Sequence, residues 1–245
     1  MISKEILLET AKRKNLTNKE HIEKDYFQDV FLSKLFKKSN KFIFKGGTAL
    51  YKLYNLNRFS EDLDFSLLNG LDFDDIKEVI ENAIGETDYF KIKSIKKTDD
   101  NIFVKINCRG ILTSYNTLRI DINFKNKVIS GFNVKNYVSD YIDINPFSLR
   151  VLKLEEMIAE KIHSIFMKQK ARHLFDLFFL LKLSKFNNDL VKSKLEIFNM
   201  KYNKKSLENK INKLGHVWHK ELKPFVFSEL PNFNVVKDYV LKRIG

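Results

Sequence analysis

The sequence has almost no cysteine, which excludes a disulfide-stabilised protein and a protein with a cysteine-rich metal site. Its one cysteine, Cys108, cannot form a disulfide bond within the chain and cannot build a cysteine-rich metal site. No apolar segment approaches the roughly 18 residues that a membrane-spanning helix requires. The first residues, MISKEILLETAKRKN, are charged every few positions and lack the apolar segment of a signal peptide. We therefore expect a cytoplasmic protein with no membrane segment.

The composition supplies apolar residues for a core and leaves a large excess of positive charge. Of the 245 residues, 44% are hydrophobic and 13% aromatic, so we expect one large domain or two small ones. The net charge of +13 is uneven: residues 1–145 hold 24 Lys and Arg against 21 Asp and Glu, whereas residues 146–245 hold 20 against 10. The basic C-terminal half favours a polyanionic partner such as nucleic acid. A solvated lysine-rich surface is the alternative.

The spacing of apolar residues changes near residue 146. Before that point, helical segments alternate with segments in which every second residue is apolar, as in strands. After that point, every segment has helical spacing. We therefore predict an α+β domain with a mixed β-sheet and flanking helices over residues 1–145, and a helical bundle domain over residues 146–245. The expected helices are 3–14, 18–37, 48–56, 72–86, 153–169, 171–184, 188–202, 206–222 and 233–243, and the expected strands are 41–44, 62–68 and four between 89 and 144.

Two aspartates, Asp62 and Asp64, lie one residue apart in the alternating segment DLDFSLL. Side chains alternate along a strand, so both carboxylates point to one face and Leu63 and Phe65 to the other. Two carboxylates this close repel each other unless a cation screens them. Mg²⁺ is suited to that place, because it takes one or two protein carboxylates together with substrate phosphates. The pair predicts a metal site, and a solvent-facing pair on an edge strand is the alternative.

A third carboxylate lies in another alternating segment, LRIDINF, where Asp121 stands between Ile120 and Ile122. If this strand neighbours the strand of Asp62 and Asp64, the three carboxylates converge. Three carboxylates can hold the two metal ions that assist phosphoryl or nucleotidyl transfer. Asp121 would then be a metal ligand or the base that prepares the acceptor hydroxyl.

A glycine pair precedes the acidic pair in FIFKGGTAL, where a strand ends at Gly46 and Gly47 and Thr48 opens a helix. Glycine lets the backbone approach a phosphate closely, and a helix N-terminus offers N–H groups and a partial positive charge. Thr48 can add a hydroxyl donor. The order of strand, glycine pair, helix and acidic strand favours a nucleotide-binding turn over an ordinary turn. For Lys45 and Arg58, which flank these motifs, a solvated position is at least as expected as a role in the site.

The segments KGGTALYKLY and RFSEDLDF resemble the nucleotidyltransferases related to DNA polymerase β. They resemble more closely the AbiEii/AbiGii toxin family of bacterial abortive-infection and toxin–antitoxin systems. The resemblance continues in EEMIAEK, which matches an E-E-x-x-x-x-K motif of the family with Glu155, Glu156 and Lys161. In RHLFDL, Asp176 matches the second aspartate of a D-x-x-D motif, and His173 replaces the first. The resemblance spans about residues 20–182.

The resemblance implies a nucleotidyltransferase fold with a helical C-terminal domain. It also implies binding of an NTP with Mg²⁺ and, in several members, transfer of nucleotides to tRNA. A cognate antitoxin would be a further partner. If the missing aspartate takes part in catalysis, His173 alters the activity; if the aspartate only positions a helix, histidine can substitute.

Two charged residues of the helical half are expected in the site. By its spacing, Lys161 is half-buried and could reach a triphosphate, or it could pair with Glu156 or Glu160 on the helix surface. Asp176 lies in the nearly apolar segment HLFDLFFLL, so its carboxylate needs a buried partner, Lys161 or Arg172. We interpret Lys161 as a phosphate ligand, Asp176 as its orienting group or a nucleotide contact, and Arg172 as further charge for the phosphates.

The sequence therefore predicts a Mg²⁺-dependent, toxin-like nucleotidyltransferase. It would transfer a nucleotidyl group from an NTP to an RNA acceptor, with tRNA as the expected acceptor and the basic helical half as its binding surface. Two alternatives stay open. The substitution at His173 suits a degenerate nucleotidyltransferase that binds nucleic acid or an antitoxin without turnover, and the acceptor of an active enzyme could instead be a protein.

Overall fold

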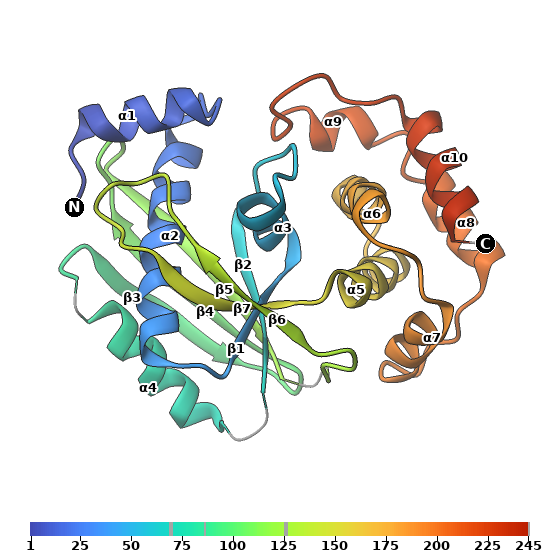
Figure 1. The fold of residues 1–245 in the computed structure, drawn as a ribbon, viewed down its shortest axis with the longest axis horizontal. Helices are drawn as coiled ribbons and strands as arrows, with labels where there is room; N and C mark the ends of the chain where they lie inside the picture. Colours follow the sequence, from blue (N-terminus) through green and yellow to red (C-terminus); the bar gives the residue numbers. More distant parts are fainter. Residues whose placement is uncertain (69–70, 86, 125–126, 245) are drawn as a thin grey trace. The chain divides into compact units, whose positions relative to one another are not determined.

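The computed structural model describes residues 1–68, 71–85, 87–124 and 127–244 (Figure 1). Its internal contacts divide the chain into two compact units. Unit 1 comprises Met1–Ala49, Ser60–Asn126 and Asn133–Val151, and unit 2 comprises Leu50–Phe59, Lys127–Phe132 and Leu152–Gly245.

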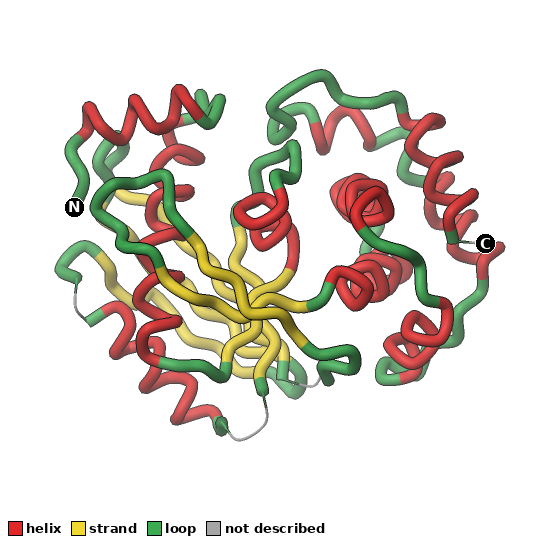
Figure 2. Tube along the Cα trace, in the orientation of Figure 1, coloured by secondary structure: helices red, strands yellow, loops and turns green. Residues whose placement is uncertain are grey.

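Unit 1 is built on a mixed sheet, which in the described residues has seven strands in the order β3-β4-β5-β2-β1-β7-β6. Figure 2 shows the strands in yellow and the helices in red. Strand β2 is antiparallel to β1 and parallel to β5, and β1 is parallel to β7. Strands β3, β4 and β5 are successively antiparallel. The predicted mixed sheet is thus confirmed. The strands are β1 (Phe42–Lys45), β2 (Asp62–Leu67), β3 (Phe90–Lys97), β4 (Asn101–Arg109), β5 (Tyr115–Asn123), β6 (Phe132–Tyr137) and β7 (Phe147–Leu152).

The two faces of β4 and β5 have different surroundings. On β4 the side chains of Ile102, Val104 and Ile106 are buried, while the residues between them are exposed or half-buried. Helix α2 (Lys19–Lys38) packs against β5, and α4 (Phe73–Ile84) packs against β3 and α2. Because successive side chains point to opposite faces, the apolar set of these strands lies in the core under these helices. The intervening side chains form the other face.

Helix α2 also fixes the turn that precedes β5. The buried carboxylate of Glu23 accepts hydrogen bonds from the backbone N–H groups of Ile111, Leu112 and Thr113. Asn116, on β5, donates to the backbone carbonyl of Glu20 over 2.8 Å. A buried carboxylate is costly without such donors, so these bonds satisfy Glu23 and hold β5 in place against the helix.

Unit 2 consists mainly of helices, and it also includes two short segments from earlier in the chain, residues 50–59 and 127–132. Helix α5 packs against α6, α7 and α8, and α6 also packs against α9 and α10. The predicted helix 206–222 is two helices, because the chain turns at Gly215, a residue with low helix propensity that lies against the ring of Phe233. The helices are α5 (Leu154–Met167), α6 (Ala171–Leu183), α7 (Asn188–Glu196), α8 (Lys204–Asn212), α9 (Trp218–Leu222) and α10 (Phe233–Arg243).

The remaining helices belong to the first half of the chain. Helix α1 spans Lys4–Arg13 and packs against α2. Helix α3 spans Gly46–Tyr54, so it begins in unit 1 and ends in unit 2. Glu86, the last residue of the expected helix 72–86, lies outside the described residues. In the described part of the chain, no helix combines the length and apolar character that crossing a membrane requires.

The division into units differs from the predicted boundary between residues 145 and 146. The segment from Phe147 to Leu152 forms β7, a strand that the sequence did not predict, and unit 1 therefore extends to Val151. Residues 50–59 and 127–132 belong to unit 2 although they precede the predicted boundary in the sequence. Long-range contacts of this kind have no signature in local spacing.

Candidate active site

The glycine turn joins β1 directly to α3. Gly46 has φ +78°, a backbone conformation that side chains other than glycine rarely adopt. A Cβ atom at Gly46 would lie 2.0 Å from Oδ2 of Asp64. Glycine is therefore needed here for two reasons, its backbone angle and the closeness of the Asp64 carboxylate to the turn.

Thr48 has a different role from the one expected. Its hydroxyl donates a hydrogen bond to the backbone carbonyl of Asp62, and its side chain is fully buried. The hydroxyl is therefore not available as the predicted phosphate donor, because its proton is already used within unit 1. Thr48 instead ties the first turn of α3 to the start of β2.

The three aspartates lie on two neighbouring strands, which is the condition under which the sequence lets their carboxylates converge. In the parallel pair of β2 and β5, Asp64 is opposite Asp121, and Asp62 is opposite Arg119. In the antiparallel pair of β1 and β2, Asp64 is opposite Lys45. Residues directly opposite each other on adjacent strands share a face of the sheet, about 5 Å apart. Lys45, Asp64 and Asp121 thus form one row across three strands, with Asp62 on the same face.

The metal site itself stays a prediction. Across residues 1–68, 71–85, 87–124 and 127–244, no group of three or more His, Cys, Asp or Glu side chains has an arrangement that could hold a metal ion. Mg²⁺ commonly takes only one or two protein carboxylates and completes its shell with substrate phosphates and water. The half-buried carboxylates of Asp64 and Asp121, in one row beside a turn with no Cβ, are a donor set that fits such an ion.

Unit 2 contains a buried ionic cluster centred on Asp176. Its carboxylate accepts two hydrogen bonds from the Arg58 guanidinium, from Nε and from Nη2, each over 2.7 Å. The ammonium of Lys161 lies 2.7 Å from Oδ2 of the same carboxylate. Burial acts to raise the pKa of Asp176, but the Arg58 and Lys161 charges outweigh it and hold that pKa below its usual value. Asp176 is therefore an anion shared by two cations.

His173 lies in the same helix as Asp176 and carries no charge. It is buried, and neither of its ring nitrogens has a hydrogen-bond partner within the described part of the chain. Burial is the main cause that lowers the pKa of His173 to about 2, and the nearby positive charge of Lys161 adds to the effect. The position that carries aspartate in the family motif therefore holds a neutral side chain in this protein.

The partners of Asp176 meet one expectation and correct another. Lys161 is one of the two predicted candidates and pairs with Asp176, whereas Arg172, the other candidate, is half-buried and forms no ion pair with Asp176 among the described residues. Arg58 takes that place, so the expectation of a solvated Arg58 is wrong: its residue is 4% exposed. Lys45 is 7% exposed and is likewise not in solvent. The sequence shows that Asp176 needs a cation but does not show which of 44 Lys and Arg residues supplies it.

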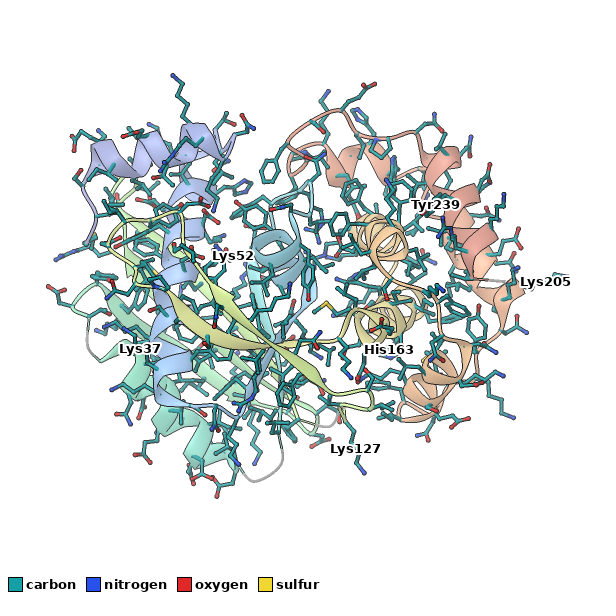
Figure 3. All side chains as sticks on the ribbon, viewed as in Figure 1. Lys37, Lys52, Lys127, His163, Lys205 and Tyr239 are labelled. Atoms are coloured by element: carbon teal, nitrogen blue, oxygen red, sulfur yellow. The ribbon has the colours of Figure 1, made fainter. Side chains whose placement is uncertain are left out.

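The motif that contains Lys161 is tied to α7 by a residue that the sequence analysis missed. Lys194 is fully buried, and its ammonium lies 2.6 Å from Glu156 and 3.4 Å from Glu160. Lys161 pairs with Asp176 instead, so the alternative that it pairs with these glutamates is not met among the described residues. Lys194 also donates to the backbone carbonyl of Lys127, which lies in the segment between β5 and β6 (Figure 3). Glu156 accepts further hydrogen bonds from the backbone N–H groups of residues 129 and 130.

The predicted site residues belong to different units. Unit 1 holds the turn and the carboxylates: Gly46, Gly47, Thr48, Asp62, Asp64 and Asp121. Unit 2 holds the charged residues of the helical half: Lys161, Arg172 and Asp176. Within unit 1 the structure brings the turn and the aspartates together, and within unit 2 it brings Lys161 and Asp176 together.

Comparison with known proteins gives one family and several similar folds. The sequence model of the family described as nucleotidyl transferase AbiEii toxin, type IV TA system, matches residues 30–235. No curated protein matches the chain significantly. MenT4, a nucleotidyltransferase toxin from Mycobacterium tuberculosis, superposes with a TM-score of 0.66 and 20% identity, over 97% of this chain and 88% of MenT4. JHP933 from Helicobacter pylori superposes with a TM-score of 0.60 and 23% identity, over 93% of this chain and 91% of JHP933. The predicted nucleotidyltransferase-type fold is confirmed.

Proposed function

Because this chain belongs to the AbiEii family of nucleotidyl transferase toxins, we propose that it transfers a nucleotidyl group from an NTP to an RNA acceptor, with tRNA as the first acceptor to test. The observation that carries the proposal is the row in which Asp64 and Asp121 lie opposite each other, beside the turn at Gly46. A carboxylate pair next to a backbone turn without a side chain is suited to a metal-bound triphosphate.

The residues of unit 1 would hold the triphosphate and prepare the acceptor. Backbone N–H groups at Gly47 and Thr48, in the first turn of α3, face an anion favourably because a helix N-terminus carries a partial positive charge. Asp64 and Asp121, with Asp62 on the same face of the sheet, would offer carboxylate oxygens to Mg²⁺, which when bound neutralises charge on the phosphates. Thr48 keeps this turn and β2 in a fixed relation through its bond to Asp62.

Asp121 is the residue that we assign to the proton of the acceptor. In the proposed reaction, the acceptor hydroxyl oxygen forms a bond to the α-phosphorus, and the bond from that phosphorus to pyrophosphate breaks. The hydroxyl proton passes to the Asp121 carboxylate, and pyrophosphate leaves with the electron pair of the broken bond. A carboxylate in hydrogen-bond reach of the hydroxyl can act in this way as a general base.

The residues of unit 2 would supply positive charge for phosphates. Arg58 and Lys161 carry two positive charges, Asp176 carries one negative charge, and His173 is neutral, so this cluster has an excess of one positive charge. Asp176 fixes the direction of the Lys161 ammonium, and Arg172 adds a half-buried guanidinium on the same helix as Asp176. We assign Lys161 and Arg172 to phosphate contacts on unit 2 and Asp176 to the positioning of Lys161.

The family description as a type IV toxin–antitoxin system adds a cognate antitoxin as a proposed partner. Two other functions are alternatives to transfer onto RNA. A chain that binds RNA or an antitoxin without turnover is favoured by His173, which stands in place of an acidic residue. A protein acceptor in place of RNA would use the same carboxylates and the same NTP.

The direct test is to incubate the purified chain with Mg²⁺, total tRNA and each of the four NTPs labelled at the α-phosphate. Labelled tRNA supports the proposal, and labelled protein identifies a protein acceptor. The double variant Asp62→Asn/Asp64→Asn should lose transfer while its circular dichroism spectrum and thermal transition stay those of a folded protein. Asp99→Asn, which changes an exposed aspartate, is the matched control and should keep full activity. Transfer that persists in the double variant would overturn the site assignment.

A further inference from the structure

The open face of strands β3, β4 and β5 carries exposed aromatic and basic side chains. Phe103 on β4 is 37% exposed and Tyr115 on β5 is 66% exposed. An exposed aromatic ring offers a flat face on which an unpaired base can stack. The exposed basic side chains of this face are Lys91 and Lys96 on β3, Lys105 and Arg109 on β4, and Arg119 on β5.

The register of the sheet places these side chains in rows that begin at the aspartates. Asp121 is opposite Asp64 on one side and opposite Phe103 on the other, and Phe103 is opposite Lys96. In the next row, Arg119 is opposite Asp62 on one side and Lys105 on the other. Adjacent strands lie about 5 Å apart, so the Phe103 backbone is about one strand spacing from that of Asp121.

Charge on this face changes sign along the rows. The carboxylates lie on β2 and at Asp121 of β5, whereas the residues that register places on this face of β3 and β4 include no Asp or Glu, counted over the described residues of those strands. They are Lys91, Ser94, Lys96, Asn101, Phe103, Lys105, Asn107 and Arg109. Lys and Arg side chains around exposed rings are complementary to a chain of phosphates with unpaired bases.

We propose that this open face of β3, β4 and β5 binds the single-stranded end of the RNA acceptor, an inference that rests on the proposed function. One unpaired base stacks on Phe103, and Lys105 and Arg119 contact the flanking phosphates. The row from Phe103 to Asp121 then directs the terminal hydroxyl toward the carboxylates. A duplex would not suit this face, because a base inside a duplex is stacked on its neighbours and offers no free plane to a side chain.

This proposal places the end of the RNA on unit 1, whereas the sequence predicts contacts with the basic helical half. Substitutions on the two surfaces distinguish these two binding sites for RNA. Phe103→Ala removes the ring, and Phe103→Tyr keeps it. Lys105→Ala removes one charge of the sheet face. The double variant Lys204→Ala/Lys205→Ala removes two exposed charges at the start of α8, where Lys205 points away from the unit (Figure 3).

The measurement is fluorescence anisotropy of a short labelled single-stranded RNA with the full chain, without NTP and without Mg²⁺. Phe103→Ala should weaken binding on the order of tenfold, because stacking of one base is lost, while Phe103→Tyr should bind as the wild-type chain does. Lys105→Ala should also lower the slope of log K against log salt by about one. Lys204→Ala/Lys205→Ala should change the affinity by less than Phe103→Ala.

The outcomes separate this inference from the proposed function. If Phe103→Ala and Lys105→Ala bind RNA as tightly as the wild-type chain, the inference is overturned. A large loss of RNA affinity in Lys204→Ala/Lys205→Ala would then indicate that the RNA binds to the helices instead. If the chain transfers no nucleotide but Phe103→Ala still weakens RNA binding, the binding face holds and the enzyme proposal fails. Asp62→Asn/Asp64→Asn should lose transfer without losing RNA affinity, because it removes negative charge beside the binding face, and a common folding defect would lower both.

Discussion

Gly46 and Asp64 are so close that the space for a Cβ atom on one is filled by the carboxylate of the other. The 2.0 Å between that Cβ position and Oδ2 is far below any van der Waals separation. Gly46→Ala should therefore displace Asp64 and also strain the backbone, since a left-handed angle costs an L-residue about 1–2 kcal/mol. We expect a fall in nucleotidyl transfer on the order of 100-fold, because small misplacements of reacting groups cost that much.

Gly131→Ala is the matched control for the backbone angle. Gly131 has φ +89°, but among the described residues a Cβ atom there would meet nothing closer than the Lys153 side chain, at 4.0 Å. Urea denaturation should show the strain cost in Gly131→Ala and a larger loss of stability in Gly46→Ala, because only Gly46→Ala also displaces Asp64, and transfer should fall only in Gly46→Ala. Equal activity losses in the two variants would show that strain alone, and not the Asp64 carboxylate, explains the effect.

Much of unit 1 around this turn could be predicted from local patterns. The alternation of Asp62, Leu63, Asp64 and Phe65 indicates which side chains share a face, and a glycine pair between a strand and a helix indicates a turn. The pairing of β2 with β5 is a different matter, since it joins residues 62–66 to residues 119–123. Local sequence spacing does not indicate which strands pair, so the pairing of β2 with β5 is known only from the structure.

Ionic partners of the helical half could not be predicted in the same way. The chain has 44 Lys and Arg residues, and the sequence around Arg58 or Lys194 contains nothing that distinguishes a buried cation from an exposed one. Arg58 reaches Asp176 across 118 positions, and Lys194 reaches Glu156 across 38. The need of Asp176 for a cation was predictable, because a carboxylate in an apolar helix must be compensated. The identity of that cation depends on packing.

His173 should make the stability of the protein depend on pH below neutrality. Its pKa is about 2 in the folded chain against an ordinary value of 6.5, so the folded state keeps it neutral while the unfolded state takes up a proton. The part of the folding free energy that depends on neutral His173 is therefore fully present above pH 6.5. It is lost as the pH falls toward 2, by about 1.4 kcal/mol per pH unit. In His173→Gln the slope of the free energy of unfolding against pH should be smaller by about 1.4 kcal/mol per pH unit, because one proton fewer is taken up on unfolding.

The measurement is the free energy of unfolding in urea between pH 7 and pH 4.5, for the wild-type chain and His173→Gln. His219→Gln, which replaces an exposed histidine, is the control and should keep the slope of the wild-type chain. Parallel curves for the wild-type chain and His173→Gln would contradict the burial of a neutral histidine at this position.

Asp176→Asn should destabilise the chain and disorder Lys161. The substitution removes the anion that both Arg58 and Lys161 face, so two buried cations lose their compensation. Loss of one partner of a buried ion pair typically costs about 3–5 kcal/mol. Asp238→Asn, at an exposed position of α10, should change the free energy of unfolding by less than about 0.5 kcal/mol. A near-neutral effect of Asp176→Asn would show that the cations find other partners.

Lys194→Met tests whether the motif that contains Lys161 depends on the buried pair behind it. Met fills a similar volume but leaves Glu156 without its cation, so we expect a loss of about 3–5 kcal/mol in chemical denaturation. The exposed pair of Lys77 and Glu81, four residues apart on α4, is the comparison, and Lys77→Met should cost no more than about 0.5 kcal/mol. Glu156→Gln added to Lys194→Met should restore part of the stability, because the amide carries no charge and can still accept from the backbone N–H groups of residues 129 and 130. If the double variant is no more stable than Lys194→Met alone, the cost arises from lost packing and not from the unpaired carboxylate.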